Sequence, residues 1–314
     1  HTPENYKQKS HLEMESITKT KIKITVKIIF SLIFIIFLTS IFIKSPELDK
    51  NWNNDQKILS YAEINGNEIK LYNIRNITYR NTTDFDVSHY NKTVKLEDLQ
   101  TLDYMIEELH GFPGFAHTLL SFGFKDGSHI AISVEIRKEK GESYSPLKGI
   151  KREFELMYVI ADERDVLNLR SNYRNDTVYL YPINIQKSSL DSLFLSMLEK
   201  TNSLQTKPEF YNTFSSTCTT NLVEEVNKNT DEFFFKYRPF ILLPGYSDNI
   251  LLNRGLIKTE ITDTNEARNY FSINEKAREY QYSNEFSKAI REYNWNLYFY
   301  SSIVLLILSF EKFN

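Results

Sequence analysis

The chain has 314 residues, of which 41% are hydrophobic and 14% aromatic, so it is long and apolar enough to bury a sizeable core. Its formal net charge of -3 provides no basic field, so a nucleic-acid partner is not expected. A single cysteine excludes an internal disulfide and a zinc–thiolate cluster, and the six histidines show no metal-ligand spacing. The sequence therefore predicts no metal and no other cofactor.

An apolar run near the N-terminus predicts a transmembrane anchor over residues 24–44. Its uncharged part, 28–43, approaches the about 20 residues that cross the hydrocarbon of a bilayer. Four closely spaced lysines precede the run, whereas the charges that follow it cancel, so residues 1–23 are expected to be a cytoplasmic tail and the bulk of the chain to lie outside. Residues 1–13 are expected to be an extension before a natural start at Met14. The alternative is a cleaved signal peptide, but a small-x-small cleavage site is lacking.

The next residues predict a linker and then the start of a folded domain. Residues 45–58 are polar and contain Pro46 and several asparagines, which is typical of a linker. The extracytoplasmic catalytic domain is expected over residues 59–262. It opens with apolar and polar residues that alternate around Asn65-Gly66, a strong hairpin signal. Residues 96–109 fit a helix and a strand equally well.

Two strands are expected over residues 116–124 and 129–136, joined by a three-residue loop that ends in Gly127. Counting back from that loop places His117 directly opposite Glu135 on the same face of the pair. A two-residue loop would shift the register by one residue and separate the two side chains, because neighbouring residues of a strand point to opposite faces.

The remaining chain alternates strands and helices and then turns polar. Further strands are expected over residues 154–161 and 178–183, and an amphipathic helix over 188–204. Residues 263–296 are polar and are predicted to be a helical, peripheral segment. Residues 297–310 form a second uncharged run, but as a helix they cover only about 21 Å, short of a ~30 Å hydrocarbon core. Contact of this run with the membrane is favoured over a core strand, and whether it spans the membrane stays open.

The only cysteine of the chain, Cys218, is expected in the first turn of a helix. It follows the capping residues 215–217 and precedes Leu222, Val223 and Val226 at helical spacing. Unpaired backbone amides and the helix dipole at that position favour negative charge, which prepares a thiol as a nucleophile. The plainer interpretation is a small buried apolar residue without chemistry.

A nucleophilic thiol needs a base within hydrogen-bond reach and a group that orients the base. His117 and Glu135 would supply these two roles to Cys218. The alternatives are a core histidine with satisfied hydrogen bonds and a solvent-facing strand carboxylate. The order histidine, acid, cysteine is the reverse of papain-like enzymes, and a circular permutation of such a core would produce it.

Four segments resemble the Lnb-type N-terminal periplasmic domain family: FAHTLLSFGFKDG at 115–127, AISVEIRKEKGESY at 131–144, YVIADERD at 158–165 and YNTFSSTCTTN at 211–221. The resemblance covers roughly residues 52–260. The family is named for a bacterial lipoprotein N-acyltransferase, which moves an acyl chain of a diacylglyceryl lipoprotein onto its N-terminal amine and leaves a lyso-form. The resemblance implies an α+β fold, an antiparallel sheet with packed helices and a circularly permuted papain-like (NlpC-type) core.

The same resemblance implies roles for individual residues. Cys218 would be the nucleophile that accepts the acyl chain, His117 the general base and acid, and Glu135 the residue that orients the histidine. Backbone amides at the start of the cysteine helix would form an oxyanion hole. Three further residues would support the site: Thr217, Thr219 and Asn221.

We therefore expect a membrane-anchored, extracytoplasmic cysteine acyltransferase that acts through a thioester intermediate. Its partners would be the membrane and a lipoprotein or lipid acyl donor. A cysteine amidase or peptidase of the cell envelope would use the same residues and differ only in the acceptor. A third possibility is a non-catalytic envelope binding domain in which Cys218 is merely buried.

Overall fold

The computed structural model describes residues 3–109, 114–234 and 239–293. The chain divides into two compact units, His1–Pro46 and Glu47–Asn314. The first unit contains a single long helix, α1 (Pro3–Phe42). Many apolar side chains of this helix between Ile22 and Ile36 are more than half exposed.

The predicted transmembrane anchor at residues 24–44 is wrong. Across the part of the chain that the structure describes, we find no helix with both the length and the apolarity needed to span a membrane. The uncharged stretch 28–43 is shorter than the about 20 residues that a spanning helix requires. The polar residues before it are not a separate tail, because they belong to the same helix.

The second unit is built on a sheet whose described strands follow the order β1-β2-β9-β8-β7-β6-β10, with β5 also paired to β2. Neighbouring strands are antiparallel except β2 and β9, which pair in parallel through Arg75 and Ala161. A short pair, β3 and β4, lies apart from this sheet. The strands are β1 (Tyr61–Asn65), β2 (Glu68–Arg75), β3 (Thr78–Tyr79), β4 (Phe85–Asp86), β5 (His89–Lys95), β6 (Leu99–Glu108), β7 (Ala116–Phe124), β8 (His129–Arg137), β9 (Glu155–Asp162) and β10 (Thr177–Pro182).

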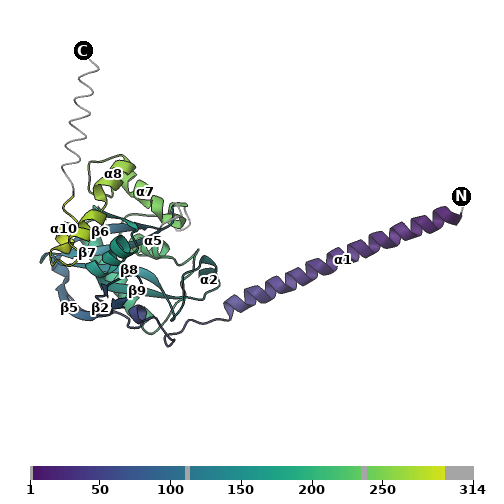
Figure 1. Ribbon diagram of the computed structural model, residues 1–314, viewed down its shortest axis with the longest axis horizontal. Helices are drawn as coiled ribbons and strands as arrows, with labels where there is room; N and C mark the ends of the chain where they lie inside the picture. The colour runs from purple at the N-terminus through teal and green to yellow at the C-terminus, as the bar shows by residue number, and fades with distance from the viewer. Residues whose placement is uncertain (1–2, 110–113, 235–238, 294–314) are drawn as a thin grey trace, which may run out of the picture. The chain divides into compact units, whose positions relative to one another are not determined.

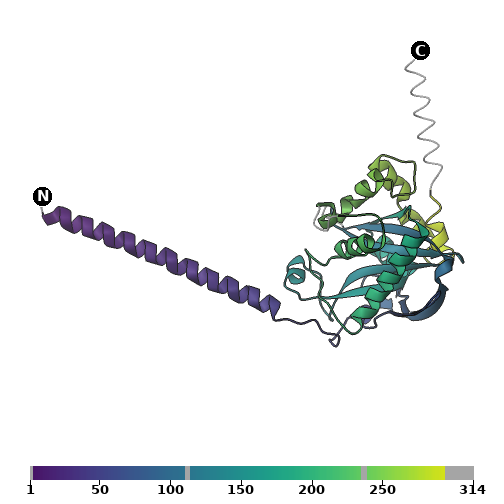
Figure 2. The same cartoon turned by 180° about the vertical axis from the view of Figure 1, so that it is seen from behind.

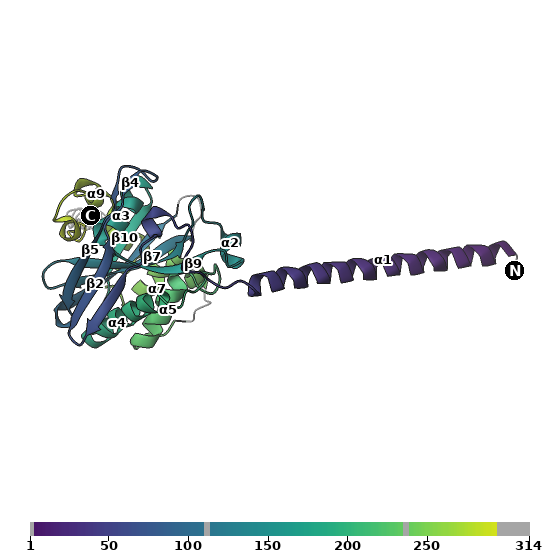
Figure 3. The ribbon, with the colours of Figure 1, turned by 90° about the horizontal axis from the view of Figure 1, so that it is seen from below.

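Helices cover both faces of this sheet (Figures 1 and 3). On one face, here called the α5 face, lie α4 (Lys187–Leu204) and α5 (Cys218–Asn229), and Figure 2 shows α4 crossing the strands. On the other, the α3 face, lie α3 (Glu163–Asn168), α9 (Asn274–Glu279) and α10 (Phe286–Ala289). The other helical segments are η1 (Asn54–Gln56), η2 (Leu96–Asp98), α2 (Pro146–Ile150), η3 (Leu169–Tyr173), α6 (Pro239–Leu242), η4 (Pro244–Tyr246), α7 (Ser247–Asn253) and α8 (Thr264–Phe271).

Each face of the sheet packs its own hydrophobic cluster, because side chains alternate along a strand. In β7, Leu120 and Phe122 point to the α5 face, where Phe122 packs on Phe194 of α4 with ring centroids 4.9 Å apart. Leu119 points to the α3 face and joins Val166 of α3. A fully buried side chain of this size contributes about 1.5–3 kcal/mol, so the two clusters hold the helices on both sides.

The predicted strands and helices of the central domain are confirmed, including the hairpin around Asn65-Gly66 and the helix that begins at Cys218. The ambiguous segment 96–109 is mostly a strand, β6. Tyr104 and Ile106 pack in the α5-face cluster, whereas Met105 packs in the α3-face cluster. A strand between two helical layers is apolar on both faces, so it lacks the simple alternation of a half-buried strand.

Two predicted boundaries are wrong. Residues 47–58 are not a free linker, because Trp52 is only 4% exposed and the Arg137 guanidinium lies 4.2 Å from the centre of its ring. The segment 263–296 is not peripheral where the structure describes it: Phe271 and Ile290 are buried in the two clusters. The apolar run 297–310 lies outside the described residues.

Candidate functional site

The register predicted for β7 and β8 is confirmed. The amide of Phe124 donates to the carbonyl of Ser128 over 2.9 Å and closes the three-residue loop. β7 and β8 pair in the register that this loop sets. The same register, extended to the start of β7, places His117 opposite Glu135. The loop therefore puts a histidine and a carboxylate on the same face of neighbouring strands.

His117 lies in a cluster of polar side chains on the α3 face. Its Nε2 is 2.8 Å from Ser133 Oγ, and Ser133 Oγ donates to Glu135 Oε1 over 2.9 Å. Glu107 of β6 is the cross-strand neighbour of His117 on the other side. Arg170 of η3 connects the two acids, donating to Glu107 Oε2 over 2.7 Å and to Glu135 Oε1 over 2.9 Å. We call these five residues the histidine cluster.

A second arginine extends this network. Arg75 donates to both oxygens of Asp165, each over 3.0 Å, and its Nη1 lies 3.9 Å from Glu135 Oε2. Burial alone would raise the pKa of Glu135, but Arg75 and Arg170 outweigh it and hold that pKa well below its usual range. Burial, and then the charge of Arg170, lower the pKa of His117 to about 4. At neutral pH the cluster therefore contains a carboxylate and an uncharged imidazole.

The stability of the protein should fall as pH drops from about 6.5 towards about 4. The unfolded histidine takes up a proton near its ordinary pKa, whereas the folded one resists until about pH 4, so protonation favours the unfolded state. The titration of one such group changes the free energy of unfolding by about 1.4 kcal/mol per pH unit within this window. Urea denaturation of the wild-type chain and of His117→Gln over pH 4–7 measures it. The variant should show the shallower slope, and equal slopes would contradict the assignment.

Cys218 is the first residue of α5, as predicted. Thr217 caps the helix: its Oγ1 accepts from the amide of Thr220 over 3.1 Å, and its own amide donates to Thr220 Oγ1 over 2.7 Å. Asn221 secures the same turn by donating from Nδ2 to the carbonyl of Thr217 over 2.7 Å. The described hydrogen bonds of this turn leave the amides of Cys218 and Thr219 without a partner. Amides left open in the first turn of a helix can donate hydrogen bonds to a negatively charged group.

Hydroxyl groups surround the thiol. Cys218 Sγ is 3.6 Å from Thr219 Oγ1, which is 3.0 Å from Thr118 Oγ1 of β7. The hydroxyl of Tyr104 on β6 bonds to Thr118. Burial, and to a lesser degree the nearby thiol, raise the pKa of Tyr104 and of Tyr211. Both tyrosines are therefore protonated donors at neutral pH, and we call these five residues the thiol site.

The structure does not bring His117 and Cys218 together. Thr118 points to the α5 face, as its bond to Thr219 shows, so the preceding residue His117 must point to the α3 face. Cys218 packs in the core cluster of the α5 face. The sheet lies between the histidine and the thiol, and the predicted hydrogen-bonded pair does not form. Of the other predicted site residues, Glu135 lies on the side of His117. The remaining three lie beside Cys218: Thr217, Thr219 and Asn221.

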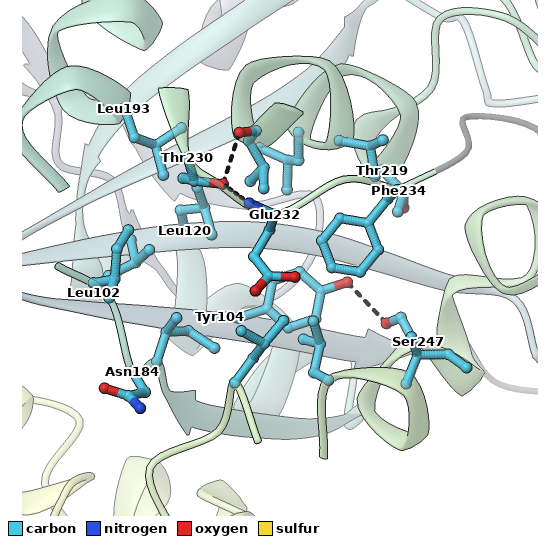
Figure 4. Close-up of a pocket in the computed structure, with 18 of the residues that line it drawn as sticks. Leu102, Tyr104, Leu120, Asn184, Leu193, Thr219, Thr230, Glu232, Phe234 and Ser247 are labelled. Carbon is cyan, nitrogen blue, oxygen red and sulfur yellow. Dashed lines mark hydrogen bonds between the residues drawn. The ribbon is translucent and has the colours of Figure 1, made fainter. Parts of the chain in front are cut away.

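An apolar pocket of about 120 Å³ adjoins the thiol site (Figure 4). Thr219 and Tyr104 line it at this end, and Tyr104 donates to or accepts from Ser247 over 2.8 Å there. Glu232 also lines the pocket and pairs with Arg254 over 3.3 Å. The apolar lining comes from β6, β7, α4, α5, α6, α7 and adjacent loops, and it includes Leu102, Leu120, Leu193, Leu222, Val223 and Val226.

Several residues of both sites were missed from the sequence. Glu107 and Tyr104 fall in segment 96–109, and recognising it as a strand would have placed them on opposite faces. Arg170 approaches Glu135 from a different part of the chain, so spacing along the sequence carries no signal for it. Within the described ranges, no group of acidic, histidine or cysteine side chains is arranged to hold a metal ion.

Comparison with known proteins gives one match. A family model described as the Lnb N-terminal periplasmic domain matches residues 86–241, a range that contains His117, Glu135 and Cys218. No curated protein and no solved structure shows a significant match. The family description indicates an extracytoplasmic location for the domain. The permuted papain-like core stays a prediction, since no solved structure supports it.

Proposed function

Because this chain belongs to the Lnb N-terminal periplasmic domain family, we propose that it is an extracytoplasmic cysteine acyltransferase. Cys218 would take a fatty acyl chain from a lipid or a lipoprotein as a thioester and pass it to an amine. The observation that carries this proposal is the apolar pocket that begins at Thr219, the residue next to the thiol.

The pocket suits an alkyl chain better than a peptide. The surface of its lining is predominantly apolar, although Asn184, Thr219, Thr230, Glu232 and Ser247 also border it, whereas a peptide would require hydrogen-bond partners along its whole backbone. Its volume of about 120 Å³ is comparable to the engineered cavity of about 150 Å³ that binds benzene. A segment of an acyl chain of about that size fits without rearrangement, with its carbonyl end directed to the thiol site.

The groups around Cys218 fit the two steps of acyl transfer. The thiolate attacks the ester carbonyl of the donor, and the amides of Cys218 and Thr219 stabilise the oxyanion. The C–O bond then breaks, and a hydroxyl such as that of Tyr104 or Tyr211 supplies the proton to the leaving alcohol. In the second step a neutral amine attacks the thioester, its proton returns to the tyrosine oxygen, and the amide forms as the C–S bond breaks and the thiolate leaves. Neutral His117 takes no part in these steps, because it lies across the sheet.

The proposal is tested by incubating the full chain with a synthetic diacylated lipopeptide and measuring the intact mass. We expect one added acyl group on Cys218 that neutral hydroxylamine removes, as is typical of a thioester. A matched control is Val226→Phe, which narrows the pocket away from the thiol. This variant should lose labelling by a long-chain donor but keep labelling by a butyryl donor. An adduct on another residue, or no adduct, would contradict the proposal.

A second candidate function is lipid binding without chemistry. The separation of His117 from Cys218 favours it, because the described residues place no ionised base beside the thiol. In that case the lipid would co-purify or bind in the pocket while Cys218 stayed unmodified. A hydrolase would form the same thioester and release free fatty acid in place of the amide product, so the product analysis distinguishes all three.

A further inference from the structure

Apolar side chains are exposed on a surface formed by α2 and the turn before α5. Tyr144, Leu147 and Phe214 are 48%, 65% and 57% exposed. Thr213 Oγ1 donates to the carbonyl of Pro146 over 2.8 Å, which fixes the turn that carries Phe214 against the helix that carries Leu147. We call Tyr144, Leu147 and Phe214 the α2 lip.

The α2 lip is continuous with the thiol site. The ring of Tyr144 packs edge-on against Tyr211, with centroids 6.4 Å apart, and Tyr211 is buried in the same core cluster as Cys218. Asn212 and Ser216 exchange two backbone hydrogen bonds and close the turn that leads into α5. Figure 1 shows α2 and α5.

A second exposed pair flanks the other end of the thiol site. Phe115 is 45% exposed and Tyr246 is 47% exposed. The two are held together because the amide of Gly245 donates to the carbonyl of Gly114 over 2.9 Å. A Cβ at Gly114 would lie 2.5 Å from the Tyr246 ring, so a glycine is required for this approach. We call Phe115 and Tyr246 the Tyr246 lip, which precedes the Ser247 that bonds to Tyr104.

The residues around the α2 lip carry an excess of positive charge. Lys148, Lys151 and Arg152 belong to α2 and its end, and the acids beside them are Glu142 and Glu153. Lys148 pairs with Glu142 over 3.5 Å at the surface, an interaction that water screens strongly. Exposed apolar tips next to basic side chains are typical of segments that lie on an anionic lipid surface.

Single exposed apolar residues are normal on proteins. Here five of them, each about half exposed, flank the thiol site that adjoins an apolar pocket. We propose that the α2 lip and the Tyr246 lip dock on the surface of an anionic bilayer, so that a lipid acyl chain reaches Cys218 without crossing water. The passage of the lipid acyl chain to Cys218 rests on the proposed function, whereas the docking itself does not require Cys218 to react.

The test places tryptophan probes in the full chain and mixes it with vesicles of phosphatidylglycerol brominated on the acyl chains, which quench fluorescence on contact. Leu147→Trp reports on the α2 lip. Tyr282→Trp is the matched control, since Tyr282 is 72% exposed beside helices of the α3 face. The signal of the unsubstituted chain is subtracted to remove its two native tryptophans. Helix α1 is present in both variants, so any binding through it affects them equally.

We expect quenching of the Leu147→Trp probe to be at least about threefold stronger than that of the Tyr282→Trp probe, and weaker on neutral brominated phosphatidylcholine. Equal quenching of the two probes, or none at position 147, would overturn the docking proposal. Equal quenching on neutral vesicles would overturn its anionic part. Quenching of the Leu147→Trp probe is also measured in the Cys218→Ala background. If strong quenching survives there and the wild-type chain shows no acylation, the proposed function is refuted and the docking proposal stands.

Discussion

Cys218→Ala is expected to abolish acyl transfer, whereas His117→Gln should leave the rate within about threefold of the wild-type rate. Removing a covalent nucleophile costs on the order of 10⁶-fold in rate in enzymes of this kind. His117 lies on the α3 face, hydrogen-bonded to Ser133, and cannot reach a thiol on the α5 face. Glutamine keeps an N–H donor for Ser133 and so keeps the fold. Steady-state acylation of a lipopeptide amine measures both variants.

A large loss of activity in His117→Gln would contradict this prediction. A general base contributes about 10²–10⁴-fold, so a loss of that size in folded His117→Gln would show that the histidine reaches the thiol in another conformation. Thermal unfolding of each variant, run in parallel, separates a loss of chemistry from a loss of structure. Reaction of Cys218 with a small thiol reagent provides an independent measurement, and its rate should be the same in wild type and in His117→Gln.

Arg170→Met is expected to lower the free energy of unfolding by about 3–5 kcal/mol. Methionine keeps an unbranched apolar stem but lacks the guanidinium, so it leaves Glu107 and Glu135 without their shared partner in the interior. Arg174 still pairs with Glu107 over 3.2 Å, which favours the lower end of the range. Since whole domains are stable by only about 5–15 kcal/mol, the variant should be close to unfolding at 37 °C. Urea denaturation at pH 7 measures the loss.

A surface arginine is the matched control for this prediction. Arg80 pairs with Asp84 and Asp86, but its side chain is 51% exposed, so Arg80→Met should change stability little. The Arg170→Met deficit should also shrink as pH falls, because carboxylates left unpaired in the interior bind protons more readily in the folded state. A deficit no larger than that of Arg80→Met would show that the arginine does not stabilise the cluster.

Local features of this protein could be predicted from its sequence because their causes lie within a few residues. The loop that ends in Gly127 sets the register that faces His117 towards Glu135. The threonines around Cys218 cap a helix at that residue. The resemblance of four segments to the Lnb-type family is confirmed by the match over residues 86–241. Periodicity, capping and short motifs all report on such neighbouring residues.

Only the tertiary structure decided which partners these elements meet. A strand with apolar residues on both faces does not reveal which face a helix one hundred residues later will cover, and α5 covers the face that Thr118 occupies, away from His117. The same holds for Arg170, which joins Glu107 to Glu135 from η3, and for the pocket that six helices and strands form beside Thr219. The sequence determined that Cys218 begins a helix and His117 begins a strand. The packing of helices on opposite sides of one sheet, driven by the burial of two separate apolar faces, decided that they stay apart.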